Sequence, residues 1–227
     1  MKPQLIKLAL TAALLSPLAV PAQPPSNIAW TPETLNLVKK ADASKGKLLA
    51  ESCQSCHGSK GEGVAAETRD DEVLPAIPAL AGQLATYTFK QLRDYADGSR
   101  VNDSMKTIAQ GLNEQQAADV AAWFASLPKS VIKSTEKITA KAEKMVTQGD
   151  GKRILPPCSV CHGSQGQGEK MDIPALAGQQ SDYFIRTLLA YKNGDRHNDV
   201  YSRMRLISQQ LNEAEIKELA VYYRNLQ

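Results

Sequence analysis

The four cysteines of the chain fall in two short clusters that share one pattern. Each cluster has two cysteines separated by two residues and followed at once by a histidine: Cys53, Cys56 and His57, then Cys158, Cys161 and His162. On a helix the paired thiols lie about one turn apart. Each could add to one vinyl group of the same haem, and the histidine would place its imidazole beneath the iron. This spacing is that of c-type haem attachment. It predicts two covalently bound haem c groups, with His57 and His162 as axial ligands.

Three other uses of paired cysteines compete with haem attachment. A thioredoxin-like redox pair needs a strand–helix–strand setting, whereas the flanking sequence reads as helix and loop. A structural zinc site usually needs four ligands, neither cluster holds four, and over a hundred residues separate the two clusters. Disulfides are the usual state of cysteines in exported proteins, but a disulfide within each pair leaves both histidines without a role. Haem attachment accounts for all of these residues at once.

The two clusters open two copies of one sequence unit. Residues 77–83 and 173–179 both read Ile-Pro-Ala-Leu-Ala-Gly-Gln, and later in both copies come Tyr-x-x-Gly-x-Arg, Asn-Asp and Leu-Asn-Glu. The first copy is nine residues longer around 64–75, and the second is three residues longer around 200–202. We expect loops at both places.

Each copy reads as a small helical bundle. Opening helices are expected over 44–52 and 139–148, and they contain small residues, Gly46 and Ala142, where helices could cross closely. Final helices are expected where apolar residues recur at i, i+3, i+4 and i+7. Each follows a capping box, Asn113-x-x-Gln116 or Asn212-x-x-Glu215. The expected fold class is therefore all-α, with two bundles that each surround one haem.

The second axial ligand of each iron must come from elsewhere in the unit. Met105 and Met204 occupy matching places, each after an Arg-x-Asn-Asp stretch and before the last helix. A thioether ligand raises the reduction potential of haem iron, and we expect these methionines to be ligands. Methionine is also a common core filler, and Met145 and Met171 are interpreted in that structural way. His197 is expected to be a solvated loop residue, although it could be a ligand if the second haem were bound by two histidines.

Two further pairs of repeated residues could complete the haem sites. A metal-bound imidazole needs a hydrogen-bond partner that fixes its tautomer, commonly a backbone carbonyl. The carbonyls of Pro78 and Pro174 in the repeated loop are the expected partners, although each could be a simple turn proline. Arg100 and Arg196 could bind haem propionates through their forked guanidinium groups, although arginines are also common on protein surfaces.

The first 22 residues have the pattern of a secretory signal peptide. Lys2 and Lys7 precede an apolar run over 8–20 and a small-residue cleavage site before Gln23. That run is short of the roughly 20 residues of a membrane span, which disfavours a retained anchor, and no later segment is apolar enough to cross a bilayer. We therefore expect a periplasmic protein. Removal of the peptide turns 27 basic residues into 25, against 24 acidic ones. This balance excludes a strongly basic nucleic-acid binder.

Composition divides the chain into consecutive segments. A polar stretch begins at Pro128 and reads as a linker between the two copies. The expected segments are a signal peptide at 1–22, an N-terminal extension at 23–40, a first domain at 41–127, the linker at 128–138 and a second domain at 139–227.

The order of helix, C-x-x-C-H, Pro-x-Leu-x-Gly loop, methionine and final helix resembles a class I cytochrome c. Two such units in tandem resemble the cytochrome c4 family of periplasmic dihaem electron carriers, over residues 41–227. The resemblance implies two domains that face each other with their haems close, each iron bound by histidine and methionine. The N-terminal extension and the insertion depart from the family pattern and could alter how a partner docks. The insertion carries the charged residues Glu67, Arg69, Asp70, Asp71 and Glu72.

The resemblance implies a mobile carrier rather than an enzyme. Electrons would come from a quinol–cytochrome c oxidoreductase or a periplasmic dehydrogenase and pass to a terminal oxidase or another acceptor. The alternative is an electron-accepting subunit of an enzyme complex, as in flavocytochrome sulfide dehydrogenases. A dihaem thiosulfate dehydrogenase or a peroxidase is disfavoured, because iron with two ligands has no open site and no cysteine remains to bind it. Redox proteins are the expected partners, nucleic acids are not, and peripheral membrane association is compatible with the sequence.

Overall fold

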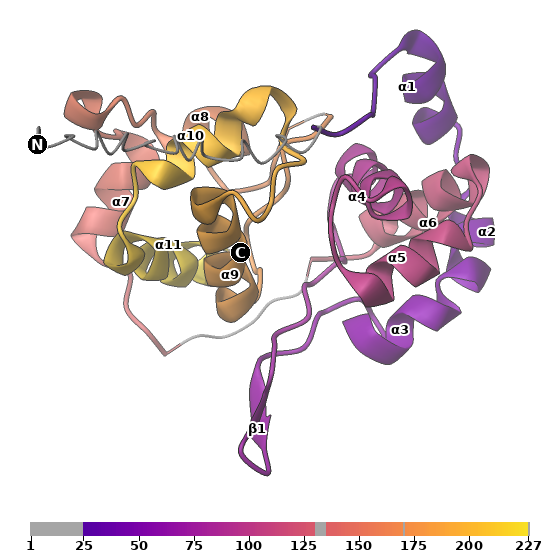
Figure 1. Ribbon diagram of the computed structural model, residues 1–227, viewed down its shortest axis with the longest axis horizontal. Helices are drawn as coiled ribbons and strands as arrows, with labels where there is room; N and C mark the ends of the chain where they lie inside the picture. The colour runs from indigo at the N-terminus through magenta and orange to yellow at the C-terminus, as the bar shows by residue number, and fades with distance from the viewer. Residues whose placement is uncertain (1–24, 130–134, 170, 227) are drawn as a thin grey trace, which may run out of the picture.

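The computed structural model describes residues 25–129, 135–169 and 171–226, which form two helical bundles side by side. Figure 1 shows the first in purple to magenta and the second in orange to yellow. The expected signal peptide at 1–22 and the central part of the expected linker, 130–134, lie outside the described residues. Within the described ranges, no helix combines the length and the apolar character that a membrane crossing requires.

The two bundles repeat one order of helices. The first contains α1 (Pro32–Lys39), α2 (Ala43–Leu49), α3 (Glu51–His57), β1 (Glu67–Arg69), β2 (Glu72–Leu74), α4 (Ala85–Asp97), α5 (Asp103–Gln110) and α6 (Glu114–Ser126). The second contains α7 (Ala140–Thr147), the 3-10 turn η1 (Gly151–Arg153), α8 (Cys158–His162), α9 (Ser181–Asn193), the 3-10 turn η2 (Val200–Ser202), α10 (Arg203–Gln209) and α11 (Glu213–Asn225). Apart from one short hairpin the described fold is all-α, as predicted.

The final helices begin where the sequence predicts. The Asn113 side chain accepts the backbone N–H of Gln116 at 2.9 Å, and the Gln116 side chain accepts the backbone N–H of Asn113 at 3.0 Å. Asn212 and Glu215 make the same reciprocal pair at 2.9 and 3.0 Å. Both capping boxes are confirmed, and each satisfies two backbone donors that a helix start leaves free.

The opening helices cross the final helices at small residues. A Cβ atom on Gly46 of α2 would lie 1.9 Å from the backbone oxygen of Asp119 on α6, so only glycine fits there. Ala142 of α7 is completely buried and packs in the second core with residues of α11. The expected helix over 44–52 is two helices, since α2 ends at Leu49 and α3 begins at Glu51.

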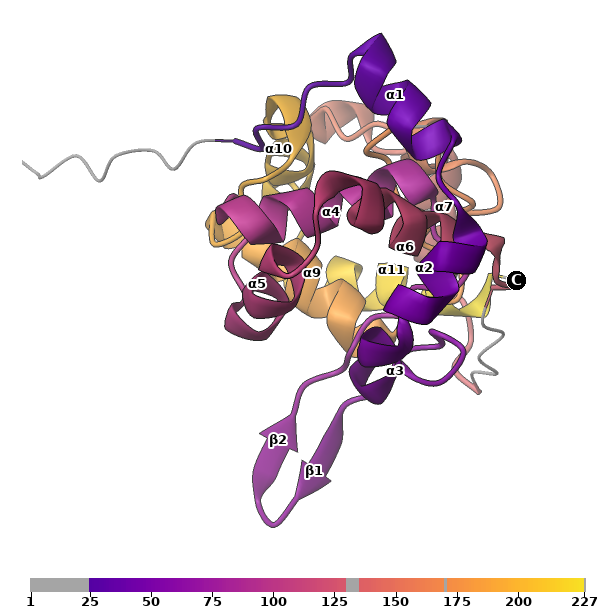
Figure 2. The ribbon, with the colours of Figure 1, turned by 90° about the vertical axis from the view of Figure 1, so that its right-hand side faces the viewer.

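The insertion of the first copy is a β-hairpin, and the expected loop is wrong there. Thr68 of β1 faces Val73 of β2 in an antiparallel pair. Asp70 and Asp71 form the turn with φ of 47° and 67°, the left-handed backbone that tight hairpins require. Figures 1 and 2 show this hairpin as an arm that leaves the helical body. The three extra residues of the second copy form the turn η2.

The N-terminal extension packs on the first domain from residue 25 onward. Ile28 and Trp30 lie against the first hydrophobic core, and α1 contacts α4 and α6. The hydroxyl of Ser26 donates to the carboxylate of Asp94, and the side-chain amide of Asn27 donates to Asp97 at 3.1 Å. The described part of the extension therefore belongs to the first domain rather than being loose.

Candidate functional site

Each cysteine pair lies on a short helix, α3 or α8, that ends in the histidine of its motif. All four cysteines are free thiols in the structure. Cys53 and Cys158 pack against the cores of their own domains, whereas Cys56 is exposed. Burial raises the pKa of the Cys53 thiol, and it raises the pKa of Cys158 to about 11. Each helix presents two thiols about one turn apart, as attachment to one haem requires.

The two histidines are buried and oriented by the same backbone contact. His57 and His162 are each 7% exposed. Nδ1 of His57 lies 2.9 Å from the carbonyl oxygen of Pro78, and Nδ1 of His162 lies 3.0 Å from that of Pro174. Burial lowers the pKa of both imidazoles, which favours the neutral ring that binds a metal. The predicted contacts with both prolines are present, and among the described residues no hydrogen bond engages either Nε2.

Local turns bring each proline to its histidine. Gly58 and Gly163 end the motif helices with φ of 88° and 81°. In the first domain the carbonyl of Gly61 then accepts the N–H groups of Leu80 and Ala81, at 2.8 and 2.9 Å, and this folds the Pro78 loop back over α3. The carbonyl of Gly166 accepts two N–H groups of the corresponding second loop at 2.8 and 3.1 Å.

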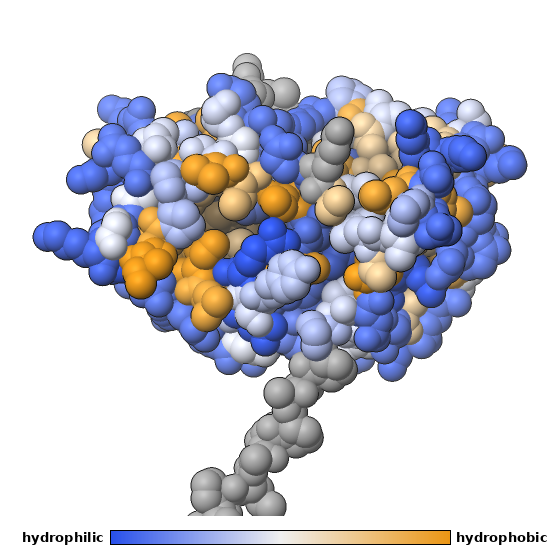
Figure 3. Space-filling model, turned by 90° about the horizontal axis from the view of Figure 1, so that it is seen from above, coloured by the Kyte–Doolittle hydropathy of each residue, from blue (hydrophilic) through white to orange (hydrophobic). Residues whose placement is uncertain are grey.

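The two candidate methionine ligands lie at matching places in their domains. Met105 is in the first turn of α5, where its backbone N–H donates to the side chain of Asn102 at 2.9 Å, and it packs on the same core as Cys53. Met204 on α10 packs on the same core as Cys158. Figure 3 shows hydrophobic side chains around a hollow in the second-domain half of one face. Met145 is a core residue with 4% exposure, as interpreted from the sequence, whereas Met171 is 40% exposed.

Arg100 and Arg196 reach across the boundary between the domains. Arg196 is 7% exposed and donates to Tyr87 and Gln91 of the first domain at 3.1 and 3.0 Å. Arg100 is half-buried and donates to Gln91 at 2.8 Å and to Tyr183 of the second domain at 2.9 Å. Burial raises the pKa of Tyr183, but the two guanidinium groups outweigh that effect and lower it to about 7. Neither arginine has a carboxylate partner among the described residues, so this boundary carries excess positive charge.

Sequence reasoning missed part of this boundary. His197 is 5% exposed, so the expectation of a solvated histidine is wrong: its loop packs between the domains, and Asn198 beside it donates to Gln91 at 3.0 Å. Gln83 and Gln179 also make contacts between the domains. Their signal was the glutamine that ends both copies of the repeated loop.

The comparisons with known proteins agree with two copies of one haem-binding arrangement. The sequence pattern of the cytochrome c family matches residues 43–128 and again residues 149–227, once for each helical domain. The chain belongs to the cytochrome c family. Both of its cytochrome c domains contain one cysteine pair with its histidine and one candidate methionine.

Similar proteins place these cytochrome c domains in the dihaem cytochrome c4 family. A cytochrome c4 from Pseudomonas aeruginosa is 32% identical over 187 residues, which cover 82% of this chain and 89% of that protein. A thiosulfate dehydrogenase electron acceptor from Stutzerimonas stutzeri is 32% identical over 180 residues, with 78% and 80% covered. The crystal structure of reduced cytochrome c4 from Pseudomonas stutzeri matches with a TM-score of 0.73 at 29% identity, covering 82% of this chain and all of that chain. The predicted family and tandem fold are confirmed: this is a dihaem electron-transfer cytochrome with two covalently bound haem c groups.

The described residues fit two such haems. Each domain offers two thiols one turn apart and a buried imidazole whose Nδ1 is occupied and whose Nε2 has no hydrogen-bond partner in the described chain. The boundary offers two arginines without a carboxylate partner among the described residues, which suits the negatively charged propionates of haem.

Proposed function

We propose that each domain holds its haem with the residues that the repeat marks. The thioether bonds would form at Cys53 and Cys56 in the first domain and at Cys158 and Cys161 in the second. The axial ligands would be His57 with Met105, and His162 with Met204. The observation that carries the proposal is the pair of buried imidazoles, each bound through Nδ1 to a prolyl carbonyl in the same way. Haem supplies a one-electron iron couple, and the chain fixes its ligands and surroundings.

We propose that Arg100 and Arg196 bind haem propionates. Their guanidinium groups lie at the domain boundary without a carboxylate partner in the described residues. Their hydrogen-bond partners there are Gln91, Asn198 and tyrosine hydroxyls. A buried guanidinium is stable where an anion pairs with it, and a carboxylate can accept its two parallel N–H groups. Propionates from both haems would therefore neutralise this boundary.

We propose that the mature protein is a periplasmic electron carrier and not an enzyme. Iron with histidine and methionine ligands offers no open position to a substrate. The signal-peptide pattern of residues 1–22 supports export. The name of one relative, a thiosulfate dehydrogenase electron acceptor, supports a periplasmic dehydrogenase as the donor, and a quinol–cytochrome c oxidoreductase is the other donor class. A terminal oxidase is the proposed acceptor.

A second candidate function is a subunit held permanently by an enzyme. The same relative supports it, since an electron acceptor can be mobile or bound. Gel filtration of the protein from native cells separates the two: a carrier elutes near the mass of one chain, and a subunit elutes with its dehydrogenase.

The test of the proposed function begins with the mass of the mature protein, made in a host that attaches haem c. Two added haems and no free thiols are expected. A redox titration should then show the thioether–iron charge-transfer band at both haems. Met105→Ala and Met204→Ala should each lose it at one haem, whereas Met145→Leu, in the core, should retain both. A mass without haem, or an unchanged band in either alanine variant, contradicts the assignment.

A further inference from the structure

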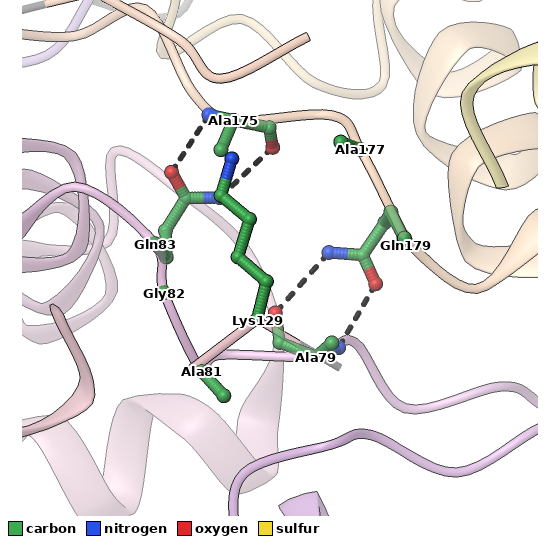
Figure 4. Close-up of a pocket in the computed structure, with 9 residues that line it drawn as sticks. Ala79, Ala81, Gly82, Gln83, Lys129, Ala175, Ala177 and Gln179 are labelled. Atoms are coloured by element: carbon green, nitrogen blue, oxygen red, sulfur yellow. Dashed lines mark hydrogen bonds between the residues drawn. The ribbon is translucent and has the colours of Figure 1, made fainter. Parts of the chain in front are cut away.

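Two glutamines bind the neighbouring domain in the same way. Gln83 belongs to the first domain, and its side-chain amide accepts the N–H of Ala175 at 2.8 Å and donates to the carbonyl of Ala175 at 3.0 Å. Gln179 belongs to the second domain and binds the N–H and carbonyl of Ala79 at 2.9 and 3.1 Å. Figure 4 shows the two amides facing each other across a small cavity that Lys129 also lines. We call these contacts the glutamine clamps.

Each clamp holds a peptide group that also binds a histidine. The N–H of Ala175 belongs to the same peptide bond as the carbonyl of Pro174, and that carbonyl is the hydrogen-bond partner of His162. Two hydrogen bonds joined by one peptide group therefore connect Gln83 to His162, and the first of them crosses the domain boundary. In the other direction, the Pro78–Ala79 peptide joins Gln179 to His57.

A peptide group that donates at nitrogen becomes a stronger acceptor at oxygen, because hydrogen bonds in a chain polarise one another. A stronger acceptor draws the Nδ1 proton of the imidazole more firmly and makes Nε2 more basic. A more basic ligand stabilises oxidised iron and so lowers the reduction potential. Burial strengthens this effect, since Gln83 is 8% exposed and Ala175 is 7% exposed.

We propose that Gln83 and Gln179 are positioning residues that act on the axial histidine of the opposite domain. Gln83 lowers the reduction potential of the haem in the second domain through His162, and Gln179 lowers that of the haem in the first domain through His57. This inference rests on the proposed function only in taking the two histidines as axial ligands. Each domain thereby sets part of the redox chemistry of its neighbour.

The test measures the two haem potentials in the holoprotein with Gln83→Leu and Gln179→Leu. Haem methyl resonances, followed by NMR across a redox titration, report each haem separately. Gln83→Leu should raise the potential of the second-domain haem and leave the first unchanged, and Gln179→Leu should do the reverse. Since cooperative strengthening is on the order of 10–30% per bond, we expect about a threefold change in the ratio of reduced to oxidised haem at fixed potential. That change equals about 28 mV, at 59 mV per tenfold for one electron.

A matched control is available at Gln180. Its side chain also crosses the boundary, donating to the backbone carbonyl of Glu62 at 3.3 Å, but that peptide contacts no imidazole: its N–H, from Gly63, donates to the backbone carbonyl of His57 at 2.7 Å. The corresponding residue of the first copy is Leu84, which makes Gln180→Leu a natural exchange. It should move neither potential. Equal shifts at both haems, a shift in Gln180→Leu, or no shift in the clamp variants would each overturn the proposal.

Two further measurements keep the test decisive. If Gln83→Leu does not mature, Gln83→Asn retains the amide but is one methylene too short to reach Ala175, and it should give the same one-sided shift. The exchange rate of the Nδ1 proton of His162 should rise in either variant. Haem content and the charge-transfer band are recorded in the same samples, so failure of the ligand assignment is visible there, whereas failure of the clamp proposal leaves both intact.

Discussion

Lys90 on α4 of the first domain donates to the backbone carbonyl of Asn198 in the second domain at 2.7 Å. Both residues are 1% exposed. The same ammonium forms an ion pair with Asp94, one turn further along α4, and the side-chain amide of Asn198 donates to that carboxylate. An ion pair of one domain is thus buried beneath a loop of the other, and its integrity and the docking of the domains depend on each other.

Removing the acid of this pair should destabilise the protein strongly. Asp94→Asn leaves the buried Lys90 without its charge partner, and breaking one half of a buried pair costs about 3–5 kcal/mol. Denaturant titration of the holoprotein should show a loss of that size in the free energy of unfolding. Asp97→Asn, on the exposed side of the same helix, should change it by about 1 kcal/mol or less.

The pH dependence of Asp94→Asn tests whether the buried charge is responsible. Burial lowers the pKa of Lys90, and the charge of Asp94 opposes that effect. Without Asp94 the folded protein should bind this proton less tightly than the unfolded chain, whose lysine has an ordinary value of 10.5. The free energy of unfolding of the variant then rises with pH as the lysine deprotonates. The difference in stability between the variant and the parent protein should therefore shrink toward pH 10.5. A deficit that is the same at every pH would point to the lost hydrogen bonds instead.

The crossing of α2 and α6 should not tolerate a side chain on Gly46. In Gly46→Ala the new methyl group would meet the backbone of Asp119 at 1.9 Å. Overpacking of a rigid contact costs about 1–3 kcal/mol, and the two helices must separate to relieve it. Thermal unfolding should show a lower midpoint. Gly151→Ala is the control, because no heavy atom lies within 4 Å of a Cβ added there; a comparable loss in both variants would falsify the steric explanation.

Glu215 should make the second domain more sensitive to acid than the first. Burial raises the pKa of this carboxyl, but bonds from Arg153 and from the backbone of Asn212 outweigh burial and lower it below the ordinary value of 4.5. Its stabilising contribution is therefore complete above pH 4.5 and is lost as the pH falls through the lower folded-state value. Hydrogen bonds to charged groups contribute about 1.5–3 kcal/mol, and we expect a loss of that size in acid.

The first copy supplies the control for this prediction. Gln116 occupies the same place in the other capping box and does not titrate. Glu215→Gln should keep the capping box, lose the ion pair with Arg153, and flatten the pH dependence of unfolding below pH 4.5. If the variant and the parent protein lose stability in parallel as the pH falls, Glu215 is not the responsible group.

The sequence predicts the contacts within each copy of the repeat and misses the contacts between the two copies. The capping boxes, the prolyl partners of the histidines and the Gly46 crossing were predictable, because each depends on spacing within one copy and most occur twice. The burial of His197 and the glutamine clamps depend on how two domains pack, and periodicity within a copy contains no information about that. The hairpin was missed because its turn is Asp70-Asp71, which lacks the glycine that typically marks such a turn.

Arg196→Gln should lower both reduction potentials, unlike the one-sided effect of the clamp variants. The guanidinium of Arg196 lies between the domains, with contacts to Tyr87 and Gln91 of the first. Positive charge near a haem disfavours the oxidised, more positive iron, so its removal favours oxidation at both sites. About a tenfold change in the ratio of reduced to oxidised haem corresponds to 59 mV, which we expect as the scale of the shift in a redox titration.

Two control variants separate the charge from other effects. Arg196→Lys keeps the positive charge but loses the forked guanidinium, so both reduction potentials should stay close to those of the parent protein. Arg186 is exposed to solvent, and Arg186→Gln should change either potential little. Unchanged potentials in Arg196→Gln would mean that this charge is balanced by something other than the haem propionates.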